Sequence, residues 1–398
     1  MVFSSPARLS LVPDLRDVAP IAPAPAAPVR LVSLDALRGM AMLAIIGFDG
    51  AVAAFAEMAK SGPPLFRDIC GFLALQFSHS EWDGVHLYDF VFPLFVFITG
   101  VGVAFALPRA LAAQSRGEVY FRIIRRSLLM YVLGVIYYGG LGQHWDEIRY
   151  VGVLQRIAVC YFVTSILFMH LRPPALAAMV VGILVGYWAL MSFVAAPGMQ
   201  AGSVAPGANL ADWFDRTFLP GRLWYGESDP EGLLSTLPAI TTCLLGALAG
   251  VLLQSGRPPA RINLMLVAGG ALMVAAGWLW GLSWSIIIKA LWTSAFVLVT
   301  AGASAILLGV ANQLLDVWRV AGASWLVWVG ANAITLYMIS GLAGFDQLAR
   351  RLVGGDFGAF IDHVTAPGAS AFLTHAVGLA LAIGLAGFLY RKRVFVRL

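Results

Sequence analysis

Two histidines, two acidic residues and a tryptophan gather between His79 and His86. A histidine can exchange a proton near neutral pH, and an indole face can stack against a sugar ring. The stretch therefore favours acid–base chemistry beside a ring-shaped ligand, while an aromatic belt at a membrane interface is the open alternative. The candidate acid–base group is His79, and the candidate substrate-binding residues beside it are Glu81, Trp82 and Asp83.

Asp49 is a second candidate because its carboxylate falls inside a long apolar segment. It follows Gly39 by roughly 15 Å of helix, which puts it near the middle of a bilayer. A charge there costs about 2.5–3.5 kcal/mol on insertion scales. We expect Asp49 to handle substrate or protons, with a buried ion pair or a protonated carboxyl as the structural alternatives. Lys289 also falls in an apolar segment, from which its ammonium is expected to reach the interface.

Motifs of several enzyme classes are missing from the sequence. His79 and His86 do not form a His-Glu-x-x-His pattern, which excludes a metalloprotease of that type. There is no Gly-x-Ser-x-Gly elbow, Walker motif or dinucleotide fingerprint. Cys70, Cys160 and Cys243 lie far apart in apolar surroundings, so they predict neither a disulfide framework nor a zinc site. We expect no metal.

The composition says which elements must position these residues. Hydrophobic residues make up 60% of the 398 residues and charged residues 12%, where a soluble chain has about 45–50% and 25%. With a mean hydropathy of +0.83, the chain cannot cover itself with a hydrated surface. The sequence therefore predicts an all-α polytopic membrane protein, and continuous apolar runs exclude a β-barrel. The net charge of +5 is spread between apolar runs, which argues against nucleic-acid binding.

About ten transmembrane helices are expected, each about 20 residues long. Residues 1–30, rich in proline and alanine, are expected to be a disordered cytosolic tail before a transmembrane domain at 31–398. Long outer loops are expected at about 57–85, 197–230 and 342–369. The expected spans are 37–56, 86–107, 121–139, 151–170, 175–196, 231–254, 262–281, 285–311, 320–341 and 370–390.

The basic residues orient this bundle. With the N-terminus inside, the inner segments hold 17 of the 26 lysines and arginines, the outer segments hold 8, and Lys289 lies within an expected span. The positive-inside rule then puts both termini in the cytosol and the loop with His79 outside.

Several motifs, met in order, resemble the heparan-α-glucosaminide N-acetyltransferase family. The resemblance covers roughly residues 30–398 and is closest to the bacterial inner-membrane branch associated with N-acetylglucosamine utilisation. It rests on Arg30-Leu-Val-Ser-Leu-Asp-Ala-Leu-Arg-Gly39, His79-x-x-Trp82-x-Gly84, Tyr88-Asp-Phe-Val-Phe-Pro-Leu-Phe-Val-Phe-Ile-Thr-Gly100, Gly152-Val-Leu-Gln-Arg-Ile157, Asp229-Pro-Glu-Gly-Leu-Leu-Ser-Thr236, Leu291-Trp-Thr-Ser294 and Gly330-Ala-Asn-Ala-Ile334.

The resemblance implies acetyl transfer across a bacterial inner membrane. Acetyl-CoA would bind from the cytosol as co-substrate, and a glucosamine amine would receive the acetyl group on the periplasmic side. The family's functional histidine corresponds to His79. An asparagine that works with it in the lysosomal members corresponds to Asp49, and this departure leaves the role of position 49 open. The partners implied are an amino sugar, acetyl-CoA and lipid, and a homodimer stays open.

The chemistry needs a base that reaches both the amine and the thioester. We prefer direct attack in a ternary complex, with Asp49 or His79 as base, over a two-step route through acetyl-His79. The oxyanion needs a hydrogen-bond donor, for which Gln155 and Asn332 are candidates. The remaining candidates are Trp82 and Trp292 as walls for the sugar, and Arg38, Arg125 and Arg126 as ligands of the CoA phosphates.

Two rival functions stay open at this point. A midplane carboxylate and an outer aromatic cluster would also suit a proton-coupled transporter for N-acetylglucosamine or a related sugar. No internal repeat supports this alternative. An O-acyltransferase acting on envelope polysaccharide is the other, and the His-x-x-Trp-x-Gly and Asp-Pro-Glu-Gly motifs argue against it.

Overall fold

The computed structural model describes residues 31–283 and 286–396, so the tail expected at 1–30 lies outside the described residues. Apart from two isolated bridges, the regular structure in these ranges is helical. In chain order the helices, with 3-10 and π-helical turns marked η, are α1 (Val32–Leu43), η2 (Ala44–Phe48), α2 (Asp49–Met58), η3 (Ala59–Ser61), α3 (Pro64–Gln76), η4 (Leu87–Phe90), α4 (Val91–Ala113), α5 (Arg116–Tyr137), η5 (Gly140–Gly142), α6 (Val153–His170), α7 (Pro173–Phe193), α8 (Leu210–Phe218), α9 (Leu233–Leu253), α10 (Pro259–Ser283), α11 (Ser294–Ala311), η6 (Asn312–Val317), α12 (Ser324–Ala331), α13 (Ala333–Leu342), α14 (Phe345–Val353), α15 (Gly355–Val364) and α16 (Ala369–Arg391).

The helix ends follow from local sequence. The Ser115 hydroxyl accepts a hydrogen bond from the Glu118 amide, and the Glu118 carboxylate accepts one from the Ser115 amide, so a capping box starts α5. Prolines at the first positions start α7, where a missing N–H costs nothing. The Thr293 hydroxyl caps α11 by accepting from the Phe296 amide.

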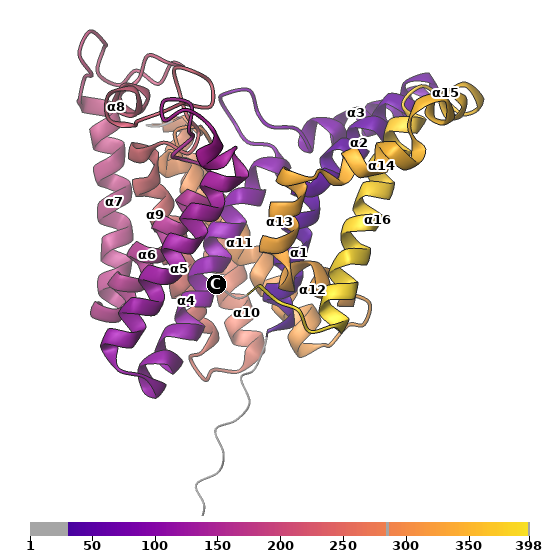
Figure 1. The fold of residues 1–398 in the computed structure, drawn as a ribbon. Helices are drawn as coiled ribbons and strands as arrows, with labels where there is room; N and C mark the ends of the chain where they lie inside the picture. Colours follow the sequence, from indigo (N-terminus) through magenta and orange to yellow (C-terminus); the bar gives the residue numbers. More distant parts are fainter. Residues whose placement is uncertain (1–30, 284–285, 397–398) are drawn as a thin grey trace, which may run out of the picture. The chain divides into compact units, whose positions relative to one another are not determined.

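Eight helices in the described ranges are long and apolar enough to span a membrane, or up to nine if α12 and α13 form one broken span. This confirms the expected all-α polytopic fold. Each of the ten expected spans contains helix. α5 falls outside the eight because its first half carries Arg116, Arg122, Arg125 and Arg126, although it packs against α6 along the bundle (Figure 1).

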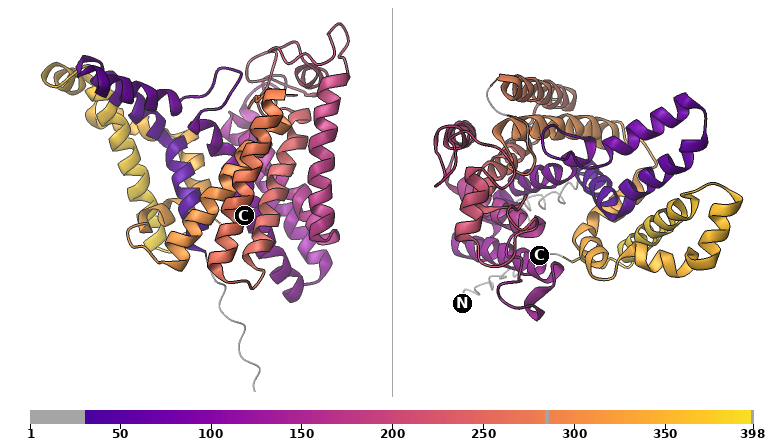
Figure 2. Two further views of the ribbon diagram at one scale, coloured as in Figure 1. Left: turned by 180° about the vertical axis from the view of Figure 1, so that it is seen from behind. Right: turned by 90° about the horizontal axis from the view of Figure 1, so that it is seen from above.

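Segments far apart in the chain lie side by side. α16 packs against α2, α12 and α14, and both views of Figure 2 draw this C-terminal helix beside the N-terminal part of the unit. α1 packs against α12, where Gly39 faces the backbone of Leu326 and Gly330 faces that of Asp35. A Cβ at either glycine would overlap the opposite helix. The two glycines thus permit a close crossing that brings Arg38 and Asn332 near one another.

Two expected spans are interrupted. At 37–56, the π-helical turn η2 contains Gly47 with φ of 153° and separates α1 from α2. At 320–341, α12 and α13 meet at Asn332 with a bend of 69°. Helix bends of this size need a local cause, and in η2 the cause is the unusual backbone that glycine permits.

The eighth expected span, 285–311, was wrong at its start. α11 begins only at Ser294. Residues 286–293 instead form turns and a bridge between Ile288 and Asp83. Lys289 therefore lies outside the spanning helix rather than one turn inside it. The reason is that the backbone pairing of Ile288 and the Thr293 cap set the start of α11 at Ser294.

The long outer connections contain short helices: α3 within 57–85, α8 within 197–230, and α14 and α15 within 342–369. In Figure 1 these helices lie at the end of the unit opposite to the start of α1 and the end of α16. That end also holds the residues around His79.

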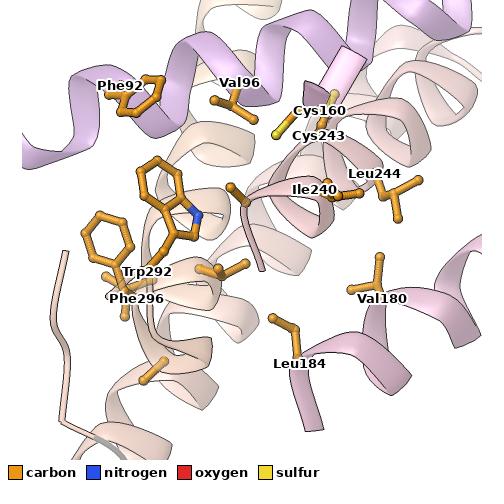
Figure 3. Packing of buried hydrophobic residues seen from close by; sticks show 14 of the residues in the cluster. Phe92, Val96, Cys160, Val180, Leu184, Ile240, Cys243, Leu244, Trp292 and Phe296 are labelled. Carbon is orange, nitrogen blue, oxygen red and sulfur yellow. The ribbon is translucent and has the colours of Figure 1, made fainter. Parts of the chain in front are cut away.

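A buried apolar cluster joins α4, α6, α7, α9 and α11 (Figure 3). Trp292 lies within it, with 1% of its surface exposed, and makes edge contacts with Phe92 and Phe296. Its indole N–H donates to the Thr242 hydroxyl. Trp292 was expected to be a wall for the sugar, but it is a core residue because both faces of its ring are already covered.

Candidate functional site

His79 belongs to a cluster with Asp89 and Lys289. Its Nδ1 lies 2.8 Å from Asp89 Oδ1 and 2.7 Å from Lys289 Nζ. Lys289 Nζ also donates to Asp89 Oδ1 at 3.0 Å. The three side chains come from different segments: His79 from the loop before η4, Asp89 from η4 and Lys289 from the segment before α11. The contact between Lys289 and Asp89 thus joins residues that are 200 positions apart in the chain.

Asp89 organises this cluster. Its carboxylate is fully buried, and its Oδ2 accepts hydrogen bonds from the backbone amides of Ser80 and His86. With Oδ2 occupied, Oδ1 faces His79 and Lys289. When Nδ1 carries the proton, it donates to Asp89 Oδ1, and Nε2, 3.3 Å from Lys289 Nζ, is the nitrogen that can accept a proton. Burial lowers the pKa of Lys289, and the charge of Asp89 and their hydrogen bond partly restore it.

The cluster lies on the wall of a cavity of about 700 Å³, which we call the outer cavity. Its other walls come from the segment after α5, the loop before α6 with the first residue of α6, and the loops before and after α8. The lining residues are His79, Ser80, Glu81, Trp82, Tyr138, Arg149, Val153, Pro206, Gly207, Trp224, Tyr225, Glu227, Ser228, Pro230, Glu231, Lys289 and Ala290.

Arg149 is the most firmly held side chain in the outer cavity. It binds Asp229 through two nitrogens, at 3.1 and 2.7 Å, and reaches Glu231 at 2.6 Å. Tyr138 and Trp224 lie against its guanidinium, with ring centres 4.4 and 4.5 Å away. Burial alone would lower the pKa of Arg149, but the hydrogen bond to Asp229 and the two carboxylate charges outweigh it, so the pKa rises. The guanidinium is therefore a fixed positive charge.

A second cavity of about 390 Å³, the inner cavity, lies between α1, α4, α5, α6 and the α12–α13 break. Val153 lines both cavities. Tyr138 of the outer wall lies beside Tyr337 of the inner wall. A thin partition made by these three side chains thus separates the two cavities.

Three expected residues line the inner cavity: Arg38, Arg126 and Asn332. Arg38 pairs with Asp35 at 3.3 Å, and Arg126 lies over the Tyr161 ring at 4.6 Å. The Asn332 amide donates to the Trp328 carbonyl at 3.0 Å, which leaves its buried Oδ1 without a hydrogen-bond partner. Such an oxygen is suited to accept an N–H of a ligand.

Asp49 lines neither cavity. Its carboxylate lies near the Tyr88 hydroxyl, and the Tyr88 ring lies against His79 with ring centres 4.7 Å apart. The two residues expected to carry the chemistry are therefore connected through one side chain rather than in direct contact.

The other expected residues divide into those at the outer cavity and those elsewhere. Glu81 and Trp82 line it, and the Trp82 indole donates to the Val204 carbonyl at 3.0 Å. Asp83 is exposed and pairs only its backbone with Ile288. Gln155 is buried, with its amide 3.4 Å from the Arg149 carbonyl. Arg125 lines a separate surface hollow with Glu118.

Sequence reasoning gave no role to Asp89, Arg149 or Glu231, and treated Lys289 as a snorkelling residue. A signal existed for two of them. Asp89 stands in the Tyr88-Asp-Phe motif, and Glu231 with Asp229 in the Asp-Pro-Glu-Gly motif. Arg149 had none, because its partners are 80 residues away.

Comparison with known proteins identifies relatives. Residues 30–145 match a family model described as a domain of unknown function, DUF5009. The heparan-alpha-glucosaminide N-acetyltransferase of Mus musculus is 30% identical over 227 residues, which cover 44% of this chain and 35% of that protein. The Homo sapiens protein of the same name is 30% identical over 230 residues, 44% of this chain and 34% of its own length.

The chain is similar to heparan-alpha-glucosaminide N-acetyltransferases. The resemblance read from the motifs is thereby confirmed. The matches span about a third of the length of these relatives. Within the described ranges, no group of three or more histidine, cysteine or acidic side chains is placed to hold a metal ion.

Proposed function

We propose that this chain is a membrane-embedded N-acetyltransferase that moves the acetyl group of acetyl-CoA onto the amine of glucosamine or a glucosaminide. The observation that carries the proposal is the pair of cavities: a His79–Asp89–Lys289 cluster faces the outer one, and Arg38 and Arg126 line the inner one. Similarity to N-acetyltransferases supports the same reading.

The outer cavity is suited to the acceptor. Its volume of about 700 Å³ is that of a small-molecule site. It combines aromatic rings at Trp82, Tyr138 and Trp224 with carboxylates, a combination that fits a sugar ring bearing a cationic amine. The inner cavity is smaller, at about 390 Å³, and its mainly apolar lining includes two arginines. Such a lining is expected for the arm and phosphates of CoA.

In the proposed reaction the acceptor arrives as an ammonium ion and must lose a proton before it can attack. His79, with Nδ1 held by Asp89, accepts that proton at Nε2. The amine nitrogen forms a bond to the thioester carbon, the carbon–sulfur bond breaks, and sulfur leaves as the CoA thiolate. The nitrogen loses a second proton and the thiolate gains one. The balance is an amide, CoA thiol and one proton from an ammonium and a thioester.

Two further groups support this step. Lys289 provides positive charge beside His79, where the carbonyl oxygen becomes negative during attack. Asp49 acts on His79 through Tyr88 rather than on the substrate. A two-step route through acetyl-His79 uses the same geometry, and ping-pong kinetics would identify it.

The test is an assay of the purified full chain with acetyl-CoA and glucosamine. We expect free thiol and N-acetylglucosamine to appear in equal amounts. Uptake of sugar into proteoliposomes without any acetyl transfer would instead favour a transporter, and acetylation of a hydroxyl would favour an O-acyltransferase. Either result would contradict the proposal.

We further propose that the protein lies in a bacterial inner membrane with both termini in the cytosol. The outer cavity then opens to the periplasm and the inner cavity receives acetyl-CoA. The distribution of the basic residues supports this orientation. α1 begins and α16 ends at the same end of the bundle, as the proposal needs.

A further inference from the structure

We propose that Glu231 is the residue of the outer cavity that binds the ammonium group of the acceptor and selects amino sugars over neutral sugars. This inference rests on the proposed function for the class of ligand. Its structural basis is independent of how the acetyl group arrives.

Arg149 carries one positive charge but contacts two buried carboxylates, Asp229 and Glu231. Asp229 takes two nitrogens of the guanidinium, while Glu231 reaches only Nη2, which it shares with Asp229. The charge of Arg156 also acts on Glu231, so two arginines face the two carboxylates. Glu231 is nevertheless the carboxylate whose hydrogen bonding is incomplete, because it accepts one hydrogen bond where Asp229 accepts four.

The two carboxylates lie differently relative to the outer cavity. Glu231 lines the outer cavity, as does Arg149, whereas Asp229 does not. Asp229 is turned to the backbone, where its carboxylate accepts from the amides of Trp224 and Glu231 itself. The carboxylate with incomplete hydrogen bonding therefore faces the space where a ligand would lie.

The surroundings of Glu231 are rigid. Tyr138 and Trp224 both pack against the guanidinium of Arg149, and Glu231 lies just before α9 with 8% of its surface exposed. Burial raises the pKa of Glu231, while the charges of Arg156 and Arg149 oppose this effect. A cation beside it would offset the cost of burying this carboxylate. The same aromatic rings offer a wall for the sugar.

A carboxylate distinguishes an ammonium group from a hydroxyl. A buried carboxylate accepts strong, charge-assisted hydrogen bonds from an ammonium. A hydroxyl at the same place offers a weaker, neutral donor. The structure thus assigns to Glu231 a preference for glucosamine over glucose.

The experiment measures binding of glucosamine and of glucose to the purified full chain by calorimetry, without acetyl-CoA, at a pH where the amine is protonated. We expect the wild type to bind glucosamine at least about 10-fold more tightly than glucose, since a hydrogen bond to a charged group has about this effect. Glu231→Gln should bind the two sugars within about 2-fold of each other. Glu231→Asp should retain part of the preference and keeps the test open if the glutamine variant does not fold.

The matched control is Glu147→Gln, which removes an exposed carboxylate two residues from Arg149. It should keep the wild-type preference. A folded Glu231→Gln that still prefers glucosamine would overturn the inference, and so would equal weakening of both sugars, which is the mark of a structural role. Because no acetyl donor is present, these outcomes stay separate from a failure of the acetyl-transfer assay.

Discussion

At the scale of single residues, the main finding is that His79 is held by a buried carboxylate. Asp89 lies 2.8 Å from Nδ1 and orients an imidazole whose side chain is 55% exposed. A half-exposed histidine without such a partner would rotate freely and spend much of its time in unproductive orientations.

Replacing His79 by alanine should reduce acetyl transfer by at least about 100-fold, the usual contribution of one acid–base group. Asp89→Asn should also lower kcat, because an amide no longer favours the proton on Nδ1. The measurement is the rate of CoA release by purified, monodisperse variants. His363→Ala is the control, since this exposed histidine lies on α15 and does not line the outer cavity. Near-normal turnover of His79→Ala would end its catalytic assignment.

Asp49 allows a different test, because it reaches His79 only through Tyr88. Asp49→Asn keeps a polar group beside the Tyr88 hydroxyl, so we expect turnover within about 3-fold of wild type at every pH. Tyr88→Phe should have a similar effect to Asp49→Leu, since both remove this polar contact. The measurement is the pH–rate profile of each variant. If Asp49→Asn loses activity at neutral pH and regains it at alkaline pH, Asp49 is itself the base.

At the scale of the helices, Asp215 of α8 fixes the start of α9. Its Oδ1 accepts a hydrogen bond from the Leu233 amide at 2.8 Å. Burial raises the pKa of Asp215 to about 7, against the effect of that hydrogen bond and of the Arg156 charge. The contact between the two helices therefore contains a carboxyl that titrates near neutrality.

The pH dependence follows from this raised pKa. Between the ordinary aspartate value of 3.8 and about 7, the unfolded chain has lost this proton and the folded chain still holds it. The contribution of Asp215 to stability is therefore complete at low pH and falls as the pH rises to about 7. Asp215→Asn should remove that fall, and its advantage over wild type should grow to about 2–4 kcal/mol by pH 8.

Thermal unfolding in detergent at pH 4.5, 6 and 8 measures this difference. Asp68→Asn, on exposed α3, controls for the change in net charge. A constant difference between Asp215→Asn and wild type across the pH range would contradict the assignment.

The helices also indicate how far the sequence predicts this structure. Apolar runs located helix in all ten expected spans, because burial in lipid dominates the choice of backbone. The start of α11 could not be found in this way. Residues 286–293 are as apolar as the spanning helices. Their backbone pairing with the distant residue Asp83 is what keeps them out of α11. The same limit hid the site: the contact of Lys289 with Asp89 depends on that irregular segment.

At the scale of the whole described unit, sidedness can be measured directly. A cysteine at Ala201, in the connection before α8, should react with an impermeant thiol reagent in intact cells. One at Ala113, the last residue of α4, should not, because the basic residues around it favour the cytosol. The native cysteines Cys70, Cys160 and Cys243 are buried, which keeps the background low. The opposite labelling pattern would reverse the orientation of both cavities.

The partition formed by Val153 and the Tyr138–Tyr337 pair has an electrical consequence. When both cavities hold water, a membrane potential falls mainly across this short stretch, and each elementary charge that crosses it gains or loses about 2.3 kcal/mol per 100 mV. In the proposed reaction, the CoA thiolate takes its proton from one of two sources. If the proton comes from the cytosol, the outer side gains one net positive charge in each turnover. If the proton comes from the acceptor's ammonium group, no net charge crosses the membrane. The source of the thiol proton therefore decides whether the cell's voltage opposes each turnover.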